Sequence, residues 1–581
     1  MKNKEIAALF DRIADALEIK GELDFKVAAY RRAARAVEDL TEDIAVLAAE
    51  NRLESIPGVG RGLADKIREY LETGRMAKYD EAFQGIPETL LELLEVQGLG
   101  GKTIRLVNRE LGVRGLDDLK RVIEDGSLAA LKGMGEKKVE NIKKGVAAHE
   151  RYTSRISIYE AVILADALTE FVRGIPGVVE ASPAGSVRRM KETVGDIDIL
   201  AAGRNGGRVI QAFIRFPGTT RVLAEGETKG SIIAKVEGVE RQVDLRVVDA
   251  AEYGAALLYF TGSKAHNIKL RGLAKDMGLK VSEYGIFRSG KRVAGRTEED
   301  CYRALGMAWI PPEMREDRGE VELALEGKLP RLVEGKDIKG DLHVHSRASD
   351  GTMTLEEIAA LGRKRGYSYI AVCDHSVSAG YAGGLSVERL LEQGREIDRL
   401  NGRLKGFRLL KGVEVDILAD GRLDFPDKVL ASLDFVVAAV HSGFKKNVTE
   451  RIAKACANPH VRVIAHPTGR LISGREGYEV DIDRVIEAAA RGGKALELNA
   501  YYDRLDLDEH NLKKAREHGV RISIGTDTHH PEGLAMMRFG VAVARRAWLG
   551  TSDILNCLSA ESLTGRAGAK KPGGKRRLNP S

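Results

Sequence analysis

The sequence predicts a multidomain α/β protein with a helical N-terminal region, a strand-containing middle region and a C-terminal parallel barrel. Apolar residues recur at spacings of three and four through residues 1–150, which is typical of amphipathic helices. Strand-like runs follow between residues 194 and 249. From residue 340, seven short apolar runs each precede a helical stretch, which is the pattern of a parallel (βα) barrel.

Shifts in pattern and composition set the domain boundaries that we expect. Residues 316–338 are charged and contain Pro330, so we interpret them as an inter-domain linker. The expected divisions are 1–88 and 89–150 (helical), 151–250 (strand-containing), 251–315 (helices and short strands), 316–338 (linker), 339–563 (barrel) and 564–581 (basic tail).

The net charge of +6 belongs to the C-terminal tail alone. Residues 564–581 contain six basic residues and no acid, so the first 563 residues carry no net formal charge. Any contact of the body with nucleic acid therefore requires local basic tracks, not a uniformly positive surface. The tail itself is either a nonspecific DNA tether or a solubilising end.

Neither a membrane span nor a secretory signal is expected. The chain has no run of about 18 apolar residues, and acids interrupt the apolar positions of its first helix. The four cysteines show no C-x-x-C spacing. We therefore expect reduced thiols and a cytoplasmic location.

Three short glycine turns interrupt the helical region, and each opens a new helix. Backbone N–H groups at such a helix start suit a DNA phosphate, and a Lys or Arg follows each turn. The pattern resembles the helix-hairpin-helix motif of DNA repair proteins, although ordinary helix connections would also fit. The candidate DNA contacts are Gly58, Gly60, Gly98, Gly100, Gly133 and Gly135.

Three aspartates mark the strands of the middle region. Asp196 and Asp198 stand two residues apart, which places both carboxylates on one face of a strand, and Asp244 lies on a second strand. Paired carboxylates repel unless cations lie between them, and oxygen ligands suit Mg²⁺ or Mn²⁺. A lone D-x-D would also fit a solvated strand face. Three such acids can hold two ions for an in-line phosphoryl displacement.

A phosphate cradle precedes these acids. Gly185 and Ser186 are followed by Arg188 and Arg189, and a guanidinium suits bidentate contact with a phosphate. The stretch GSVRRMKETVGDIDIL, with VDLR and YFTGS downstream, closely resembles family X DNA polymerases over roughly residues 1–315. The resemblance implies a nucleotidyltransferase-type palm at 151–250 and a thumb at 251–315. It also implies that Asp196 and Asp198 bind both metals and that Asp244 helps to hold the catalytic one.

The resemblance assigns further roles. Tyr259, Phe260 and Gly262 would sense the sugar, Asn267 the base edge and Arg271 the template. The nucleotide-binding set that it implies is Gly185, Ser186, Arg189, Gly195, Tyr259, Phe260, Gly262, Asn267 and Arg271.

In the first hairpin domain, Lys26 and Tyr30 match positions around a 5′-phosphate pocket, and Lys66 matches the Schiff-base lysine of the family's deoxyribose phosphate lyase. Gly62, however, stands where lyase-active members carry another lysine. A lysine amine must lose its proton to attack a carbonyl, which a neighbouring cation promotes. Lys66 is therefore either a lyase residue or a phosphate contact.

Histidines gather in the C-terminal region, where ten of the twelve follow residue 340. Most stand at predicted strand ends, where a barrel directs side chains to one mouth. Mixed imidazole and carboxylate ligands suit two or three Zn²⁺, Mn²⁺ or Fe²⁺ ions, which can activate a bound water. The nine candidate ligands are His343, His345, Asp350, His375, Glu414, His441, His466, Asp527 and His529.

This pattern resembles the PHP (polymerase and histidinol phosphatase) domain, a distorted seven-stranded barrel with a trinuclear metal site, over roughly residues 338–560. In such polymerases the domain is associated with 3′–5′ exonuclease activity, 3′-end trimming and incision at abasic sites. We therefore expect a monomeric repair polymerase of base excision repair that fills gapped or primer–template DNA with dNTPs. The alternatives are a PHP domain that acts as a small-molecule phosphatase or as a structural platform.

Overall fold

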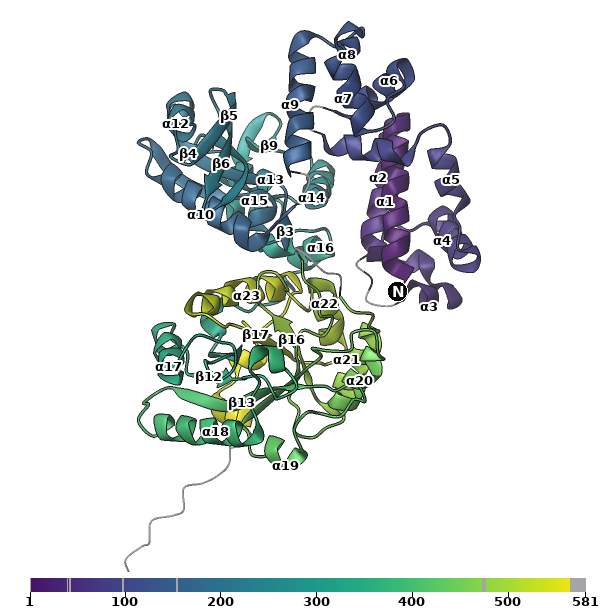
Figure 1. Ribbon diagram of the computed structural model, residues 1–581. Coiled ribbons are helices and arrows are strands. Elements are labelled where there is room, and N and C mark those ends of the chain that lie inside the picture. Colours follow the sequence, from purple (N-terminus) through teal and green to yellow (C-terminus); the bar gives the residue numbers. More distant parts are fainter. Residues whose placement is uncertain are drawn as a thin grey trace, which may run out of the picture. The chain divides into compact units, whose positions relative to one another are not determined.

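The computed structural model describes residues 2–38, 40, 43–96, 99–152, 155–472 and 477–564. The chain forms two compact units, an N-terminal unit of Met1–Arg155 and a C-terminal unit of Ile156–Ser581 (Figure 1). Gly98 and residues 565–581 of the basic tail lie outside the described residues. The finer domain boundaries stay a prediction.

The described part of the N-terminal unit is helical, as the apolar spacing predicts. Two clusters of buried side chains hold it together, one around α1, α2 and α4 and the other around α6, α7 and α9. The helices are α1 (Lys2–Lys20), α2 (Asp24–Glu38), α3 (Ile44–Ala49), α4 (Arg61–Thr73), α5 (Ala77–Phe83), α6 (Gly101–Leu111), α7 (Leu116–Glu124), α8 (Ser127–Ala130) and α9 (Glu136–Tyr152).

The C-terminal unit begins with a five-stranded sheet of order β2-β4-β7-β6-β5, in which only β4 and β7 are parallel. Alternate residues of β4 face opposite sides: Ile197 and Ile199 pack with α10 and α12, whereas Leu200 packs with α13. The elements are β1 (Ile156–Ser157), α10 (Ile158–Arg173), β2 (Val178–Pro183), α11 (Gly185–Arg188), β3 (Thr193–Val194), β4 (Ile197–Gly203), α12 (Gly206–Phe213), β5 (Thr219–Glu225), β6 (Lys229–Val236) and β7 (Val239–Val248).

The next segment contains helices and a small antiparallel sheet. Its elements are α13 (Tyr253–Thr261), α14 (Lys264–Asp276), β8 (Lys280–Ser282), β9 (Gly285–Arg288), β10 (Lys291–Ala294) and α15 (Glu298–Ala304). Residues 316–338 include α16 (Glu320–Leu325). Glu320 is fully buried, with its Oε1 2.6 Å from His266 Nδ1, so this segment packs against the preceding helices.

The last region is a nearly closed parallel barrel, which confirms the predicted fold class. Its seven strands follow in chain order from β11 to β17, and a bridge between Val344 and Thr528 joins the first strand to the last. The strands are β11 (Gly340–Val344), β12 (Tyr369–Val372), β13 (Arg408–Asp416), β14 (Phe435–Ala439), β15 (Val463–Ile464), β16 (Ala495–Asn499) and β17 (Ile522–Gly525). Most are buried on both faces, so they form continuous apolar runs.

Helices surround this barrel. They are α17 (Leu355–Lys364), α18 (Val387–Asn401), α19 (Asp427–Leu430), α20 (Val448–Cys456), α21 (Ile482–Gly492), α22 (Glu509–Glu517), α23 (Met537–Arg546) and α24 (Ala560–Thr564). All four cysteines are described and are free thiols. Among the described residues, no helix is long and apolar enough to cross a membrane.

Candidate active sites

The three aspartates of the middle region come together because β4 and β7 are parallel neighbours. Asp198 pairs with Asp244 in register across these strands. Asp196 stands one residue before β4, so it precedes the strand that was expected to include it. Burial, followed by the charges of Asp196 and Asp244, raises the pKa of Asp198 to about 7. Such crowding fits a divalent cation among the carboxylates.

Two side chains of the same sheet contact Asp244. Lys229 Nζ lies 2.7 Å from Asp244 Oδ2, and Gln242 Nε2 donates to Asp244 Oδ1 at 2.9 Å. These contacts hold the carboxylate against the sheet, beside Asp198.

Gly185 lets the backbone approach this site. Its φ is +56°, and a Cβ atom there would lie 2.4 Å from Asp198 Oδ2. A side chain would therefore strain the backbone and displace the carboxylate. Ser186 follows in α11 and is half-buried, as is Gly195 before β4.

The two arginines after this turn have different ion-pair partners. Arg188 makes a bidentate pair with Glu298, at 2.7 and 2.9 Å, and the fully buried Arg315 pairs with the same carboxylate. Arg189 Nε lies 3.0 Å from Glu316 Oε1, and its Nη1 donates to the carbonyl of Thr261. Arg189 therefore links the cradle to the end of α13.

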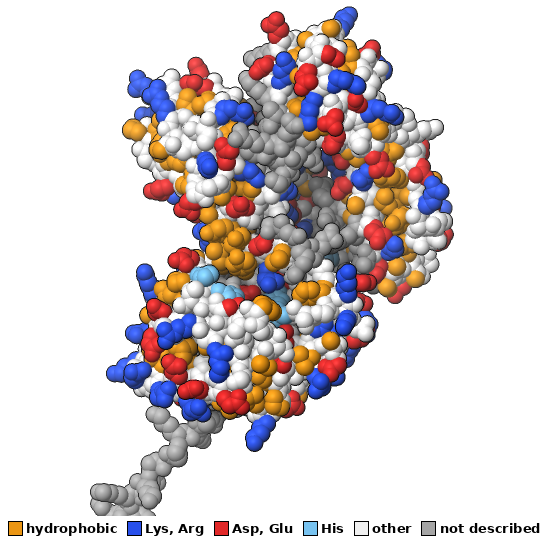
Figure 2. Space-filling view, viewed as in Figure 1, with side chains coloured by type: hydrophobic (Ala, Val, Ile, Leu, Met, Phe, Trp, Pro, Cys, Tyr) orange, Lys and Arg blue, Asp and Glu red, His pale blue; other side chains and the backbone are white. Residues whose placement is uncertain are grey.

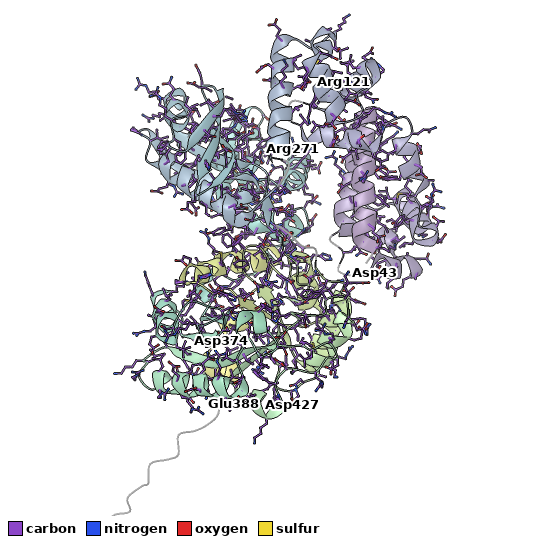
Figure 3. All side chains as sticks on the ribbon, in the orientation of Figure 1. Asp43, Arg121, Arg271, Asp374, Glu388 and Asp427 are labelled. Carbon is purple, nitrogen blue, oxygen red and sulfur yellow. The ribbon has the colours of Figure 1, made fainter. Side chains whose placement is uncertain are left out.

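The C-terminal end of α13 carries the two aromatic residues that were expected to sense the sugar. Tyr259 and Phe260 meet edge to face, with ring centroids 5.2 Å apart, and Gly262 ends the helix at a φ of +71°. Asn267 Nδ2 donates to the Tyr259 carbonyl at 2.7 Å. Arg271 is exposed on α14 (Figure 3).

In the N-terminal unit, the described hairpin glycines border open space. Gly60 and Gly100 cap the N-termini of α4 and α6, and Gly133 has a φ of +91°. A Cβ atom at Gly60, Gly100, Gly133 or Gly135 would meet nothing within 4 Å. At Gly58, where φ is +85°, it would lie 3.5 Å from Arg32 Cβ. This accessibility is compatible with close approach of a phosphate backbone.

The three candidate phosphate-pocket residues differ in exposure. Lys66 is half-buried, and its Nζ donates to the Gly62 carbonyl at 2.7 Å. Lys26 pairs with Glu22 at 2.8 Å on the surface. Tyr30 is nearly buried against Phe10, and burial raises its pKa to about 12.

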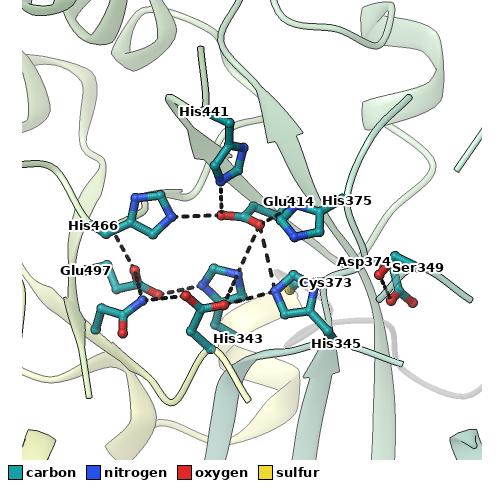
Figure 4. A network of polar contacts seen from close by, with 12 residues as sticks. His343, His345, Ser349, Cys373, Asp374, His375, Glu414, His441, His466 and Glu497 are labelled. Carbon is teal, nitrogen blue, oxygen red and sulfur yellow. Dashed lines mark hydrogen bonds and ion pairs between the residues drawn. The ribbon is translucent and has the colours of Figure 1, made fainter. Parts of the chain in front are cut away.

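In the barrel, the nine candidate ligands converge at the carboxyl ends of the strands. Figure 4 labels His343, His345, His375, Glu414, His441 and His466 among them. Glu414 on β13 lies at their centre: its carboxylate is 2.9 Å from His375 Nδ1, 3.2 Å from His441 Nε2 and 3.0 Å from His466 Nε2. Asp527 Oδ1 is 3.1 Å from His345 Nε2, and Asp350 Oδ1 is 3.2 Å from His529 Nε2.

Eight of the nine fall into three groups whose ligand atoms lie within 4.8 Å of one another. The groups are His345, Asp350, His375 and His529; His343, His345 and Asp527; and His375, Glu414 and His441. Three buried imidazole nitrogens make no hydrogen bond, namely His343 Nε2, His345 Nδ1 and His466 Nδ1, and His375 Nδ1 and Glu414 Oε2 lie 2.9 Å apart without hydrogen-bond geometry. Orphaned donors of this chemistry fit divalent cations.

Carboxylates also control the charge of these imidazoles. Burial alone would lower the pKa of His375, but Glu414 and Asp350 raise it to about 10. Glu414 and Asp416 act in the same way against burial at His441, whose pKa rises to about 9. The local field therefore favours positive charge at the mouth of the barrel.

Sequence reasoning missed two acids that orient the ligands. Glu497 on β16 lies 2.7 Å from His343 Nδ1 and accepts a hydrogen bond from the His466 backbone N–H at 2.8 Å. Asp416 lies 3.2 Å from His441 Nδ1. Partners of this kind fix the ring orientation of a metal ligand. The sequence features that could have indicated these two acids are the E-V-D run at the end of β13 and the E-L-N run at the end of β16.

A cavity of about 320 Å³ opens beside the ligands and is lined by Tyr381, His441, Phe444, Tyr478 and Arg504, among others. Figure 2 shows that histidines of the C-terminal unit reach its surface, and that basic and acidic side chains intermingle on the visible face of each unit. The body is therefore not uniformly positive on the faces shown, as its zero formal charge predicts.

Comparison with known proteins identifies the modules of the chain. Four family models match this chain: a helix-hairpin-helix domain (residues 1–76), a SAM-like helix-hairpin-helix tandem (90–147), a DNA polymerase beta thumb (256–316) and a PHP domain (341–501). The chain is 40% identical to the DNA polymerase/3′-5′ exonuclease PolX of Bacillus subtilis (strain 168), over 97% of this chain and 99% of that protein. The chain belongs to the PHP-containing family X DNA polymerases.

Two further relatives each match a part of this family X chain. DNA polymerase lambda of Rattus norvegicus is 28% identical over 54% of this chain and 56% of its own length. A protein named "Probable phosphatase" from Thermoanaerobacter sp. (strain X514) is 30% identical over 37% of this chain and 89% of its own length. The family resemblance expected from the sequence is confirmed.

Proposed function

We propose that this chain is a DNA-directed DNA polymerase that fills short gaps during repair and carries a 3′–5′ exonuclease in its PHP barrel. The observation that carries the proposal is the register of Asp198 and Asp244 on parallel strands, with Gly185 against Asp198. This arrangement would hold carboxylates beside a triphosphate, and the barrel would provide a second, separate set of metal ligands.

In the palm, Asp196, Asp198 and Asp244 would hold two Mg²⁺ or Mn²⁺ ions, and Ser186 and Arg189 would bind the incoming dNTP. The ions would supply charge neutralisation and activation of the primer oxygen. Tyr259 and Phe260 would shape the sugar pocket, and the carbonyl contact of Asn267 fixes the amide beside it.

In the barrel, the nine ligands would hold two or three Zn²⁺ or Mn²⁺ ions. Glu497 and Asp416 orient His343 and His441 through their Nδ1 atoms. The aromatic rings of Tyr381, Phe444 and Tyr478 line the adjacent cavity, and such rings suit stacking of a base from a frayed 3′ end. Arg504 lines the same cavity and suits a phosphate.

A second candidate function for the barrel is hydrolysis of a small phosphomonoester. The similarity of this region to the "Probable phosphatase" favours it. The hairpin and thumb matches in the same chain favour DNA, because those modules are typical of proteins that bind it.

The decisive experiment follows a 5′-labelled primer on gapped DNA with dNTPs and Mn²⁺. Asp196→Ala with Asp198→Ala should abolish extension and leave primer shortening, whereas His343→Ala with His345→Ala should do the reverse. Shortening that survives loss of both histidines would refute the nuclease assignment. Hydrolysis of a small phosphomonoester without primer shortening would favour the phosphatase.

A further inference from the structure

The palm and the barrel share a buried charge network that includes Arg189. Arg546 is the last residue of the barrel helix α23. Its Nη1 donates to the Arg189 carbonyl at 2.7 Å, and both of its Nη atoms lie 3.2 Å from Glu316 Oε1. Because Arg189 Nε also contacts that oxygen, at 3.0 Å, Arg546 contacts both the backbone of Arg189 and its ion-pair partner.

A second carboxylate extends the network. Glu509 begins α22 and lies 2.9 Å from Arg546 Nη2, 2.9 Å from Arg318 Nη1 and 3.8 Å from Lys191 Nζ. The side chain of Arg546 is only 1% exposed, and those of Glu316 and Arg189 are 14% exposed. These charges are therefore poorly screened by solvent.

Ion pairs keep the carboxylates of this network charged. The network combines four cations with two carboxylates: Arg189, Arg546, Arg318 and Lys191 against Glu316 and Glu509. Burial alone would raise the pKa of Glu316, but Arg546 and Arg189 hold it low. Glu316 then stays ionised and remains an ion-pair partner of both Arg189 and Arg546.

We propose that Arg546 is a positioning residue for dNTP binding, through which the PHP barrel contributes to the nucleotide affinity of the polymerase site. The inference rests on the proposal that Arg189 binds the triphosphate. Arg546 shares the Glu316 carboxylate with Arg189 and fixes the Arg189 backbone. Without the Arg546 guanidinium, Glu316 would depend more strongly on Arg189 and would compete with the triphosphate for it.

The adjacent residue provides a matched control. Arg545 lies on the same helix and joins the barrel to residues outside the palm, with its Nε 2.7 Å from Glu313 Oε1 and its Nη1 donating to the Val333 carbonyl at 3.0 Å. Its partners are thus Glu313 and Val333, whereas Arg546 contacts Arg189 and Glu316. A variant of Arg545 therefore tests whether the loss of a neighbouring arginine contact of α23 is sufficient to change nucleotide binding.

The experiment measures kcat and the KM for dNTP in single-nucleotide incorporation on gapped DNA. It compares full-length wild type with Arg546→Gln, Arg545→Gln and Arg189→Gln. We expect Arg546→Gln to raise KM about tenfold with kcat nearly unchanged, since the lost hydrogen bonds involve charged groups. Arg545→Gln should leave KM near the wild-type value, and Arg189→Gln should raise it at least as much as Arg546→Gln.

Thermal unfolding and primer shortening by the same preparations report whether each variant is folded. If Arg546→Gln does not fold, Arg546→Lys is used in its place, because lysine keeps the charge but cannot make the bidentate contact. Arg546→Lys should raise KM by a smaller factor than the tenfold expected for Arg546→Gln. A wild-type KM in folded Arg546 variants would overturn the inference, and so would an equal rise in KM in Arg545→Gln. A raised KM in Arg189→Gln in the same experiment would still support Arg189 as a triphosphate ligand. An unchanged KM in Arg189→Gln would overturn both.

Discussion

Replacement of Gly185 by alanine tests whether close backbone approach to Asp198 sets the polymerase rate. The new Cβ would lie 2.4 Å from Asp198 Oδ2, whereas ordinary contact begins at 3.4 Å, so the carboxylate must retreat by roughly 1 Å. A misplacement of about 1 Å can cost about 100-fold in rate when it disturbs reacting groups. The positive φ adds about 1–2 kcal/mol of backbone strain.

Gly238 separates these two effects, because its φ is +86° but a Cβ there would meet nothing within 4 Å. Gly238→Ala should therefore cost similar stability and leave catalysis within about threefold of wild type. The assay is single-turnover incorporation of one nucleotide into gapped DNA, with primer shortening as a check on folding. Equal incorporation rates for the two variants would refute the argument from close approach.

Three further predictions concern the barrel and the N-terminal unit. Glu497→Gln should weaken Mn²⁺ binding at the barrel by about 10–100-fold, because Glu497 orients His343, and a Mn²⁺ titration of primer shortening that matches wild type would contradict this. Removal of divalent ions by a chelator should lower the unfolding temperature in calorimetry, because the buried ligand atoms of the barrel would lose the ions that they bind. His343→Ala with His345→Ala should not show this decrease in the unfolding temperature. Gly62→Lys should increase borohydride trapping of a 5′-deoxyribose phosphate substrate relative to wild type, because it adds a cation one turn before Lys66. If the yield of trapped adduct is unchanged when Lys66→Ala is added, Lys66 is not the attacking amine.

Local signals in the sequence predicted most of the fold and most of the candidate ligands. Strand ends in a parallel barrel share one mouth, so the positions of His343, His375 and His441 along the chain were sufficient to bring them together. In the same way, D-x-D and a third strand acid indicated Asp198 and Asp244 as partners.

The sequence pattern predicted less about acids that lie outside a recognisable ligand motif. Glu497 and Asp416 were missed because a carboxylate in a strand carries no mark of the imidazole that it orients. Residues 316–338 were interpreted as a linker from their charge, and this boundary stays a prediction, but the composition did not indicate that Glu320 is buried against His266. The number of charged residues in a segment does not show whether another part of the chain packs over them.

The sequence by itself determined the two chemistries, because motif spacing within one element fixes which ligands share a face. Only the tertiary structure decided how they are connected. Arg546 lies more than 300 residues beyond Arg189 in the chain, and no local pattern relates the two. Their contact exists because α23 packs against the segment around η3 (Pro312–Met314), which places Arg546 beside Glu316 and the Arg189 backbone.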